Sequence, residues 1–205
     1  MNTAIHRAVR RDLQRFIAAL GSFRDGDTDR AAGLGRAWDN FDDQLTHHHS
    51  GEHEIAWPAL QSLGVSTELL TQFDAEHEAM AASLGDARAA ITRLRSTAKA
   101  ADADAAREAF EKLQTVTISH LDHEEAEFEP VYLAHRDGPE LKAMGKAFAK
   151  VSPSRGGRFF AWVSDGATPE EMDAITADIP GPVLRVLSGI FGHGYRRDVA
   201  PVWRS

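Results

Sequence analysis

Apolar residues recur every three or four positions along most of this 205-residue chain, with polar residues between them. That period places the apolar side chains on one face of an α-helix. β-Branched residues are sparse, and no run of useful length alternates with a period of two, so strands are not expected. The pattern predicts an all-α protein. The long helices expected span residues 3–23, 28 to about 57, 67–97, and from within 98–110 to about 133.

Single residues mark the ends of these helices. Gly21 and the polar run 24–29 indicate a helix end followed by a loop. Pro58 should end or kink the second helix, because its ring clashes with the carbonyl group four residues back. Ser66 or Thr67 can cap the third helix, since Glu68 and several apolar residues follow.

The pattern changes after residue 137. Shorter helices are expected over 140–151, 158–163, from Thr168-Pro169 onward and over 183–191, with a break at 152–157. We therefore predict a main up-down four-helix bundle over residues 1–137 and a helical C-terminal extension over residues 138–205 that packs on it. The extension is rich in arginine, for which a solvated face is the simplest explanation and an acidic partner or a dimer contact the alternatives. Its apolar content also suggests a lid over the bundle.

Composition narrows the class of protein. Hydrophobic residues make up 42% and charged residues 26%, as in an ordinary globular domain. The net charge of −8 argues against nucleic-acid binding, which needs a basic face. No stretch approaches the roughly 20 apolar residues of a membrane span or the apolar core of a signal peptide. The absence of cysteine excludes disulfides and metal–thiolate sites and fits a cytoplasmic protein.

Two segments share one layout of chemically active residues. In HHHSGEHEIAWPAL (47–60) and SHLDHEEAEFEPVY (119–132), a histidine lies ten residues before a proline and a glutamate lies six before it. These pairs are His48 with Glu52 and His120 with Glu124. A spacing of four places both side chains on one helix face, where an imidazole can bind one metal ion and the carboxylate can reach a second. A third such pair, His123 with Glu127, has no counterpart in the first segment and is interpreted as solvent-exposed.

The repeat extends to two further histidines. His6 precedes His48 by 42 residues, and His77 precedes His120 by 43. The chain therefore resembles two similar helical hairpins, whose packing would gather four imidazoles and two carboxylates in a bundle core. Such a donor set suits iron, manganese or zinc, and a bridged pair of ions with unfilled positions favours iron. The other histidines, among them His49, are interpreted as surface residues or as outer partners of the ligands.

The combined pattern resembles the hemerythrin-like family of HHE cation-binding proteins over about residues 1–135. That resemblance implies an up-down four-helix bundle with a non-haem centre of two iron ions, bridged by two carboxylates and an oxo or hydroxo group. It implies that His6 and His48 bind one iron, that His77 and His120 bind the other, and that Glu52 and Glu124 bridge them. Members of the family bind oxygen, sense oxygen or iron, or handle nitric oxide and peroxide.

One position departs from the oxygen carriers of that family. They have a further histidine where this chain has Phe73, so one iron would lack a nitrogen ligand. Tyr132, Tyr195 and Glu76 are conceivable replacements, although no spacing selects one. We expect reaction with a small oxidant (O2, peroxide or NO) in a redox or detoxification role, including catalase-like activity. A non-enzymatic oxygen or iron sensor or an iron store is the alternative, and a helical interaction module with incidental histidines is a third. The oligomeric state is not predicted.

Overall fold

The structure is a computed structural model that describes residues 2–178 and 181–204. Every regular element in these residues is helical, which confirms the all-α prediction. The longest helices are α1 (Asn2–Gly21), α2 (Thr28–Gly51), α4 (Thr67–Thr97) and α5 (Ala100–His135). The shorter elements are η1 (Glu52–Ala56), α3 (Trp57–Ser62), α6 (Pro139–Phe148), α7 (Pro153–Val163), α8 (Pro169–Asp178), α9 (Gly181–Phe191), α10 (His193–Asp198) and η2 (Ala200–Trp203). No described helix is both long and apolar enough to cross a membrane.

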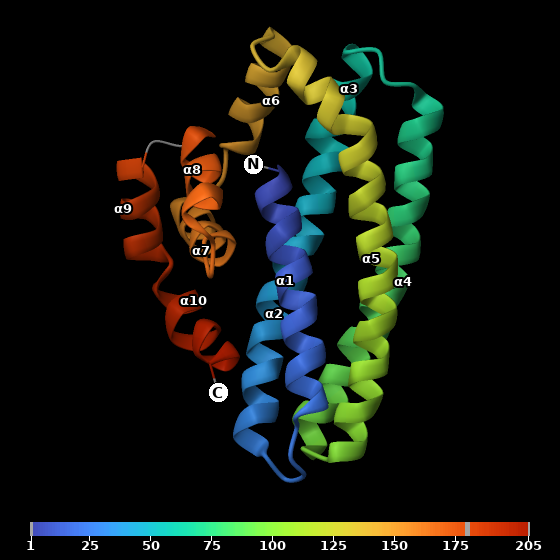
Figure 1. Ribbon diagram of the computed structural model, residues 1–205, viewed down its shortest axis with the longest axis vertical. Helices are drawn as coiled ribbons and strands as arrows, with labels where there is room; N and C mark the ends of the chain where they lie inside the picture. Colours follow the sequence, from blue (N-terminus) through green and yellow to red (C-terminus); the bar gives the residue numbers. More distant parts are fainter. Residues whose placement is uncertain (1, 179–180, 205) are drawn as a thin grey trace.

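The long helices lie side by side, and consecutive ones run in opposite directions (Figure 1). α1 packs against α2 and α5, while α4 packs against α2 and α5. Two apolar clusters fill the interior. The larger contains Phe16, Phe41 and Phe110, and the smaller contains Trp57, Phe73 and Phe128.

A polar layer separates these two clusters. On α4, for example, Phe73 belongs to the smaller cluster and Met80 to the larger, with His77 between them. The fold therefore gathers polar side chains at one level of an otherwise apolar interior.

Pro58 neither ends the second helix nor bends it sharply into a loop. Instead, α2 passes into the π-helical segment η1, in which the backbone N–H of Trp57 donates to the carbonyl oxygen of Glu52. Pro58 then occupies the first turn of α3, where a missing N–H costs nothing because that turn has unpaired donors in any case. The expected interruption is therefore a local widening of the helix. Ser66 caps α4 as expected, accepting a hydrogen bond from the backbone N–H of Leu69.

The expected break at residues 152–157 lies earlier in the chain: residues 149–152 separate α6 from α7, and residues 153–157 form the start of α7. Ser152 caps that helix and accepts a hydrogen bond from the backbone N–H of Arg155. Gly157 serves packing and not chain reversal: a Cβ there would lie 2.4 Å from the carbonyl oxygen of Leu187. The glycine lets α7 and α9 approach closely. α10 and η2 were not expected from the sequence.

The segments after residue 138 lie against the bundle. Figure 1 shows α7 to α10 along the side formed by α1 and α2, and α6 near α3. The buried carboxylate of Asp12 on α1 joins them, since it accepts from Trp162 Nε1 at 2.7 Å and from Arg11 Nε at 2.8 Å. Nearby, the Tyr195 hydroxyl donates to Asp165, which also binds Arg15. The division of the chain into a bundle and an extension stays a prediction.

Candidate metal centre

The polar layer contains all six residues that the sequence selected. His6 comes from α1, His48 from the last turn of α2, and Glu52 from the start of η1. His77 comes from α4, and His120 and Glu124 come from α5. They form two groups of donors, and within each group the donor atoms all lie within 4.8 Å of one another. The first group is His6, His48, Glu52 and Glu124, and the second is His49, Glu52, His77 and His120.

The first group lies between α1, α2 and α5. His6 Nε2 is 3.3 Å from His48 Nε2 and 3.1 Å from an oxygen of Glu124. His48 Nε2 is in turn 2.9 Å from Glu52 Oε1. His6, Glu52 and Glu124 are buried.

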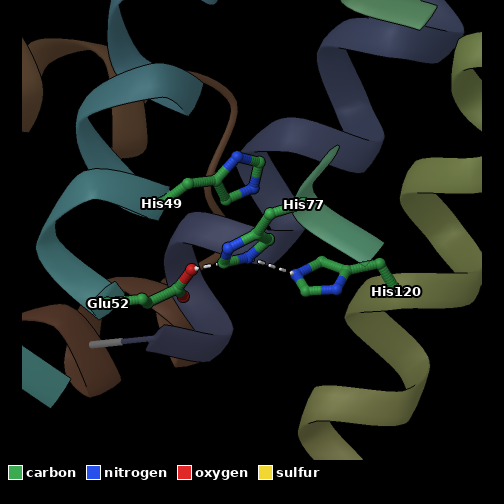
Figure 2. Close-up of side chains that lie close together, drawn as sticks. All are labelled: His49, Glu52, His77 and His120. Atoms are coloured by element: carbon green, nitrogen blue, oxygen red, sulfur yellow. Dashed lines mark hydrogen bonds and ion pairs between the residues drawn. The ribbon is translucent and has the colours of Figure 1, made fainter. Parts of the chain in front are cut away.

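The second group lies between α2, α4 and α5. His77 Nε2 is 3.2 Å from His120 Nε2 and 3.4 Å from Glu52 Oε2, and both contacts are drawn in Figure 2. The two oxygens of Glu52 therefore face different groups, which is the arrangement expected of a bridging carboxylate. Glu124 belongs to the first group alone, so its bridging role stays a prediction.

His49 is a donor that the sequence pattern did not indicate. Its ring stacks on that of His77, with centroids 4.3 Å apart and an interplanar angle of 25° (Figure 2). Consecutive residues on a helix point about 100° apart, so one group cannot use both His48 and His49. α2, however, lies between α1 and α4, and each histidine reaches the group on its own side. The internal repeat could not reveal His49, because Leu121 occupies the matching position in the second segment.

Outer carboxylates orient two of these histidines. Glu125 accepts from His6 Nδ1 at 2.8 Å and also binds Arg10. Glu76 accepts from His120 Nδ1 at 2.9 Å. A proton held on Nδ1 leaves the Nε2 lone pair free to bind a metal ion.

Glu76 also accepts from His123 Nδ1 at 2.8 Å, and the His123 ring stacks on Phe73. His123 is therefore tied to the outer carboxylate and does not extend freely into solvent, contrary to the expectation from its sequence spacing.

The donor set fits a cation. In each group two imidazole Nε2 atoms face one another at 3.2–3.3 Å, and two facing lone pairs repel unless a cation or a proton lies between them. Within the described residues, both oxygens of Glu52 and one oxygen of Glu124 are buried and have histidine nitrogens nearby but accept no hydrogen bond of good geometry, and His49 Nε2 has no hydrogen-bond partner. Buried polar atoms are rarely left so, and a bound metal ion would satisfy them.

The charges of the metal-free cluster follow from the same contacts. Burial lowers the pKa of His6, but Glu124 and Glu125 outweigh it and raise that pKa to about 9. Burial raises the pKa of Glu52, but His48 and His77 hold it well below its usual range. Burial and the neighbouring His48 lower the pKa of His49. The Glu52 carboxylate is thus anionic, and His6 holds a proton where a metal ion could bind.

None of the three residues considered as a replacement for the missing histidine belongs to either donor group. Glu76 is an outer partner, as described above. Tyr195 lies in the C-terminal segment and donates to Asp165 at 3.0 Å. Tyr132 packs beside the smaller apolar cluster, which also buries Phe73, but it stays near the site: burial and the charges of Glu124 and Glu52 raise its pKa.

A buried metal-binding cluster at the centre of antiparallel helices defines a helical cation-binding domain. The family model described as "Hemerythrin HHE cation binding domain" matches residues 3–132, which span the long helices and all the donors. The chain belongs to this family. Comparisons with curated proteins and with solved structures gave no match.

Proposed function

We propose that the protein holds two iron ions and binds or reacts with a small oxidant (O2, peroxide or NO), in a redox or detoxification role. The observation that carries the proposal is the single carboxylate of Glu52 between two groups of nitrogen and oxygen donors. Each group offers four donors, whereas octahedral iron takes six, so positions would remain for a small ligand. Bound iron would supply Lewis acidity and one-electron redox chemistry.

Side chains beside the donor groups would contact the small ligand and help to select it. Gln44 lies one turn before His48 on α2, and Thr117 lies one turn before His120 on α5. Both are buried, and Gln44 Nε2 and Thr117 Oγ1 have no hydrogen-bond partner among the described residues. They offer polar contacts next to the donor groups, which favours a small ligand with polar oxygen or nitrogen atoms. The apolar clusters on both sides would keep bulk water away.

The test begins with the full chain purified from iron-fed cells. We expect about two iron ions per chain, a change in the absorption spectrum on exposure to oxygen or peroxide, and gas evolution from peroxide that His120→Ala abolishes. His135→Ala is the matched control, since His135 is exposed at the end of α5. Protein that takes up no iron would overturn the proposal. Metal uptake that survives loss of both Glu52 and Glu124 would overturn the bridging assignment.

A sensor is the second candidate, and one observation favours it. α1 carries His6 on one side, while Arg7 on the next position donates to the carbonyl oxygen of Val163 in α7 at 2.8 Å. A metal-dependent shift of α1 would therefore reach the C-terminal helices directly. Iron binding that changes protease sensitivity in residues 153–178, without peroxide turnover, would favour the sensor. A cytoplasmic location agrees with the cysteine-free sequence and is part of the proposal.

A further inference from the structure

The indole of Trp57 connects the second donor group with the protein surface. It lies nearly parallel to the His77 ring, at an interplanar angle of 10° and a centroid distance of 5.9 Å. Its Nε1–H donates to Asp74 Oδ1 at 3.0 Å, and His53 Nδ1 is 3.1 Å from the same oxygen. Trp57 is only 5% exposed, whereas the side chain of Asp74 is 40% exposed. An aromatic path thus runs from a candidate metal donor to an acid at the surface.

Packing alone does not require this arrangement. Trp57 also contacts Phe73 and Phe128, but a phenylalanine would fill that space as well. The indole adds an electron-rich ring against His77 and an N–H directed at a carboxylate. Burial raises the pKa of Asp74, but the hydrogen bonds from Trp57 and His53 outweigh it, and the pKa lies below its usual value. Asp74 is therefore an anion beside the indole at neutral pH.

The other three tryptophans lack this combination. Trp203 packs edge-on against Phe16, and its Nε1 has no hydrogen-bond partner among the described residues. Trp38 packs in the larger cluster against Phe16, Phe41 and Phe110. Trp162 donates to Asp12, but the charge of that carboxylate is shared with Arg11 and Arg15. An indole cation would be stabilised beside the anionic Asp74, and Trp57 is also the one of the four tryptophans for which the described residues show stacking on a candidate metal donor.

We propose that Trp57 is a redox-active residue that passes single electrons between the protein surface and the metal centre. The inference rests on the proposed function, which supplies iron oxidised by peroxide or oxygen. The indole gives one electron to the oxidised iron through His77 and becomes a radical cation, which Asp74 stabilises by its negative charge. A one-electron reductant at the exposed Asp74–His53 edge then returns one electron to the indole. One electron enters and one leaves, and no atom is transferred.

The first experiment uses the iron-loaded full chain, one equivalent of hydrogen peroxide, and electron paramagnetic resonance of rapidly frozen samples. We expect an indole radical in the unmodified protein and in Trp38→Phe, and its loss in Trp57→Phe. Reduction of the oxidised centre by ascorbate should slow about tenfold or more in Trp57→Phe. Asp74→Asn should slow it less, because the amide oxygen still accepts from Nε1 but carries no charge.

The second experiment needs no variant. After excess peroxide, peptide mass spectrometry should find oxidation concentrated at the buried Trp57 and not at the equally buried Trp38, and only when iron is bound. Equal oxidation of the two, or a radical that persists in Trp57→Phe, would overturn the inference while leaving the proposed function intact. A chain that takes up no iron would overturn both.

Discussion

A carboxylate oxygen of Glu76 lies 2.9 Å from Nδ1 of His120 and so determines which ring nitrogen faces the donor cluster. Glu76→Ala should therefore weaken metal binding by about 10–100-fold, because the imidazole loses both its orientation and its tautomer. Glu76→Gln should cost less, since the amide oxygen can still accept the hydrogen bond. Competition with a coloured chelator would measure the affinity. Glu78→Ala, at an exposed position of the same helix, is the control and should change nothing.

His49→Leu should remove one of two bound metal ions and leave the other in place. The substitution takes a nitrogen donor from the second group only, while the first group keeps its four donors. Elemental analysis of the purified variant would count the ions. His47→Leu changes an exposed neighbour and should retain full metal content. Full occupancy in His49→Leu would show that His49 is not a ligand.

Metal uptake should release a proton at neutral pH, because the metal-free protein holds one on His6, whose pKa is about 9. The folded-state pKa is raised above the unfolded value of about 6.5. Its contribution to the stability of the metal-free protein is therefore complete below about pH 6.5 and is lost as the pH rises through about 9.

Protonation of His6 contributes on the order of 3 kcal/mol to the free energy of unfolding of the metal-free protein, at 1.36 kcal/mol for each pKa unit. Thermal melts of metal-free protein at several pH values would measure it. His6→Gln should flatten the alkaline side of the profile, whereas His53→Gln, at an exposed site, should not. An unchanged profile in His6→Gln would contradict the assignment.

Asp12→Ala should destabilise the fold by about 3 kcal/mol, since it leaves one guanidinium N–H and a buried indole N–H without their acceptor. These groups are Arg11 Nε and Trp162 Nε1, and Arg11 would keep its bonds to two backbone carbonyl oxygens. Chemical denaturation gives the free energy of unfolding. Asp86→Ala, exposed on α4, should stay within about 0.5 kcal/mol of the parent. A loss of stability below that limit for Asp12→Ala would mean that the C-terminal helices are held without any measurable contribution from Asp12.

Two glycine substitutions should change the free energy of unfolding in opposite directions. Gly157→Ala places a methyl group 2.4 Å from the backbone of α9, and the forced separation should cost about 1–3 kcal/mol. Gly85 lies within α4, and a methyl group added there would meet no neighbouring atom within 4 Å, so Gly85→Ala should stabilise by roughly 0.5–1 kcal/mol. Denaturation midpoints of the two variants against the parent would test both, and equal signs would contradict the close packing of α7 on α9.

The long helices were predictable because each carries a strong local pattern. The run from Ile5 to Leu20 and the cap at Ser66 both depend on residues close in sequence. The helices after residue 138 were less predictable. Gly156 and Gly157 look like a break in isolation, and only the distant Leu187 explains why a helix needs a glycine there.

The six donors were predictable for a related reason, since duplication made their spacing visible in one sequence. His49 was not, because its use depends on the position of α4 beside α2 and not on any spacing along the chain. The contact between Trp57 and Asp74 could not be predicted from the sequence either. Their contact joins residues 17 positions apart on two elements, and neither residue belongs to a repeated motif.

The π-helical turn at 52–56 changes the direction in which side chains point along the continuous helical segment from α2 to α3. His48 and His49 lie before this turn and Glu52 is its first residue, and all three belong to the donor groups. The wider turn rotates everything after it by about one residue's angle. The backbone N–H of Trp57 bonds to the Glu52 carbonyl oxygen across five residues, so deleting one residue between them would leave the regular spacing of an α-helix and keep the indole in place relative to Glu52. The donors before the turn would keep their places. The wider turn thus lets Glu52 and Trp57 lie on the same side of the helix, which a regular α-helix of the same sequence would not allow.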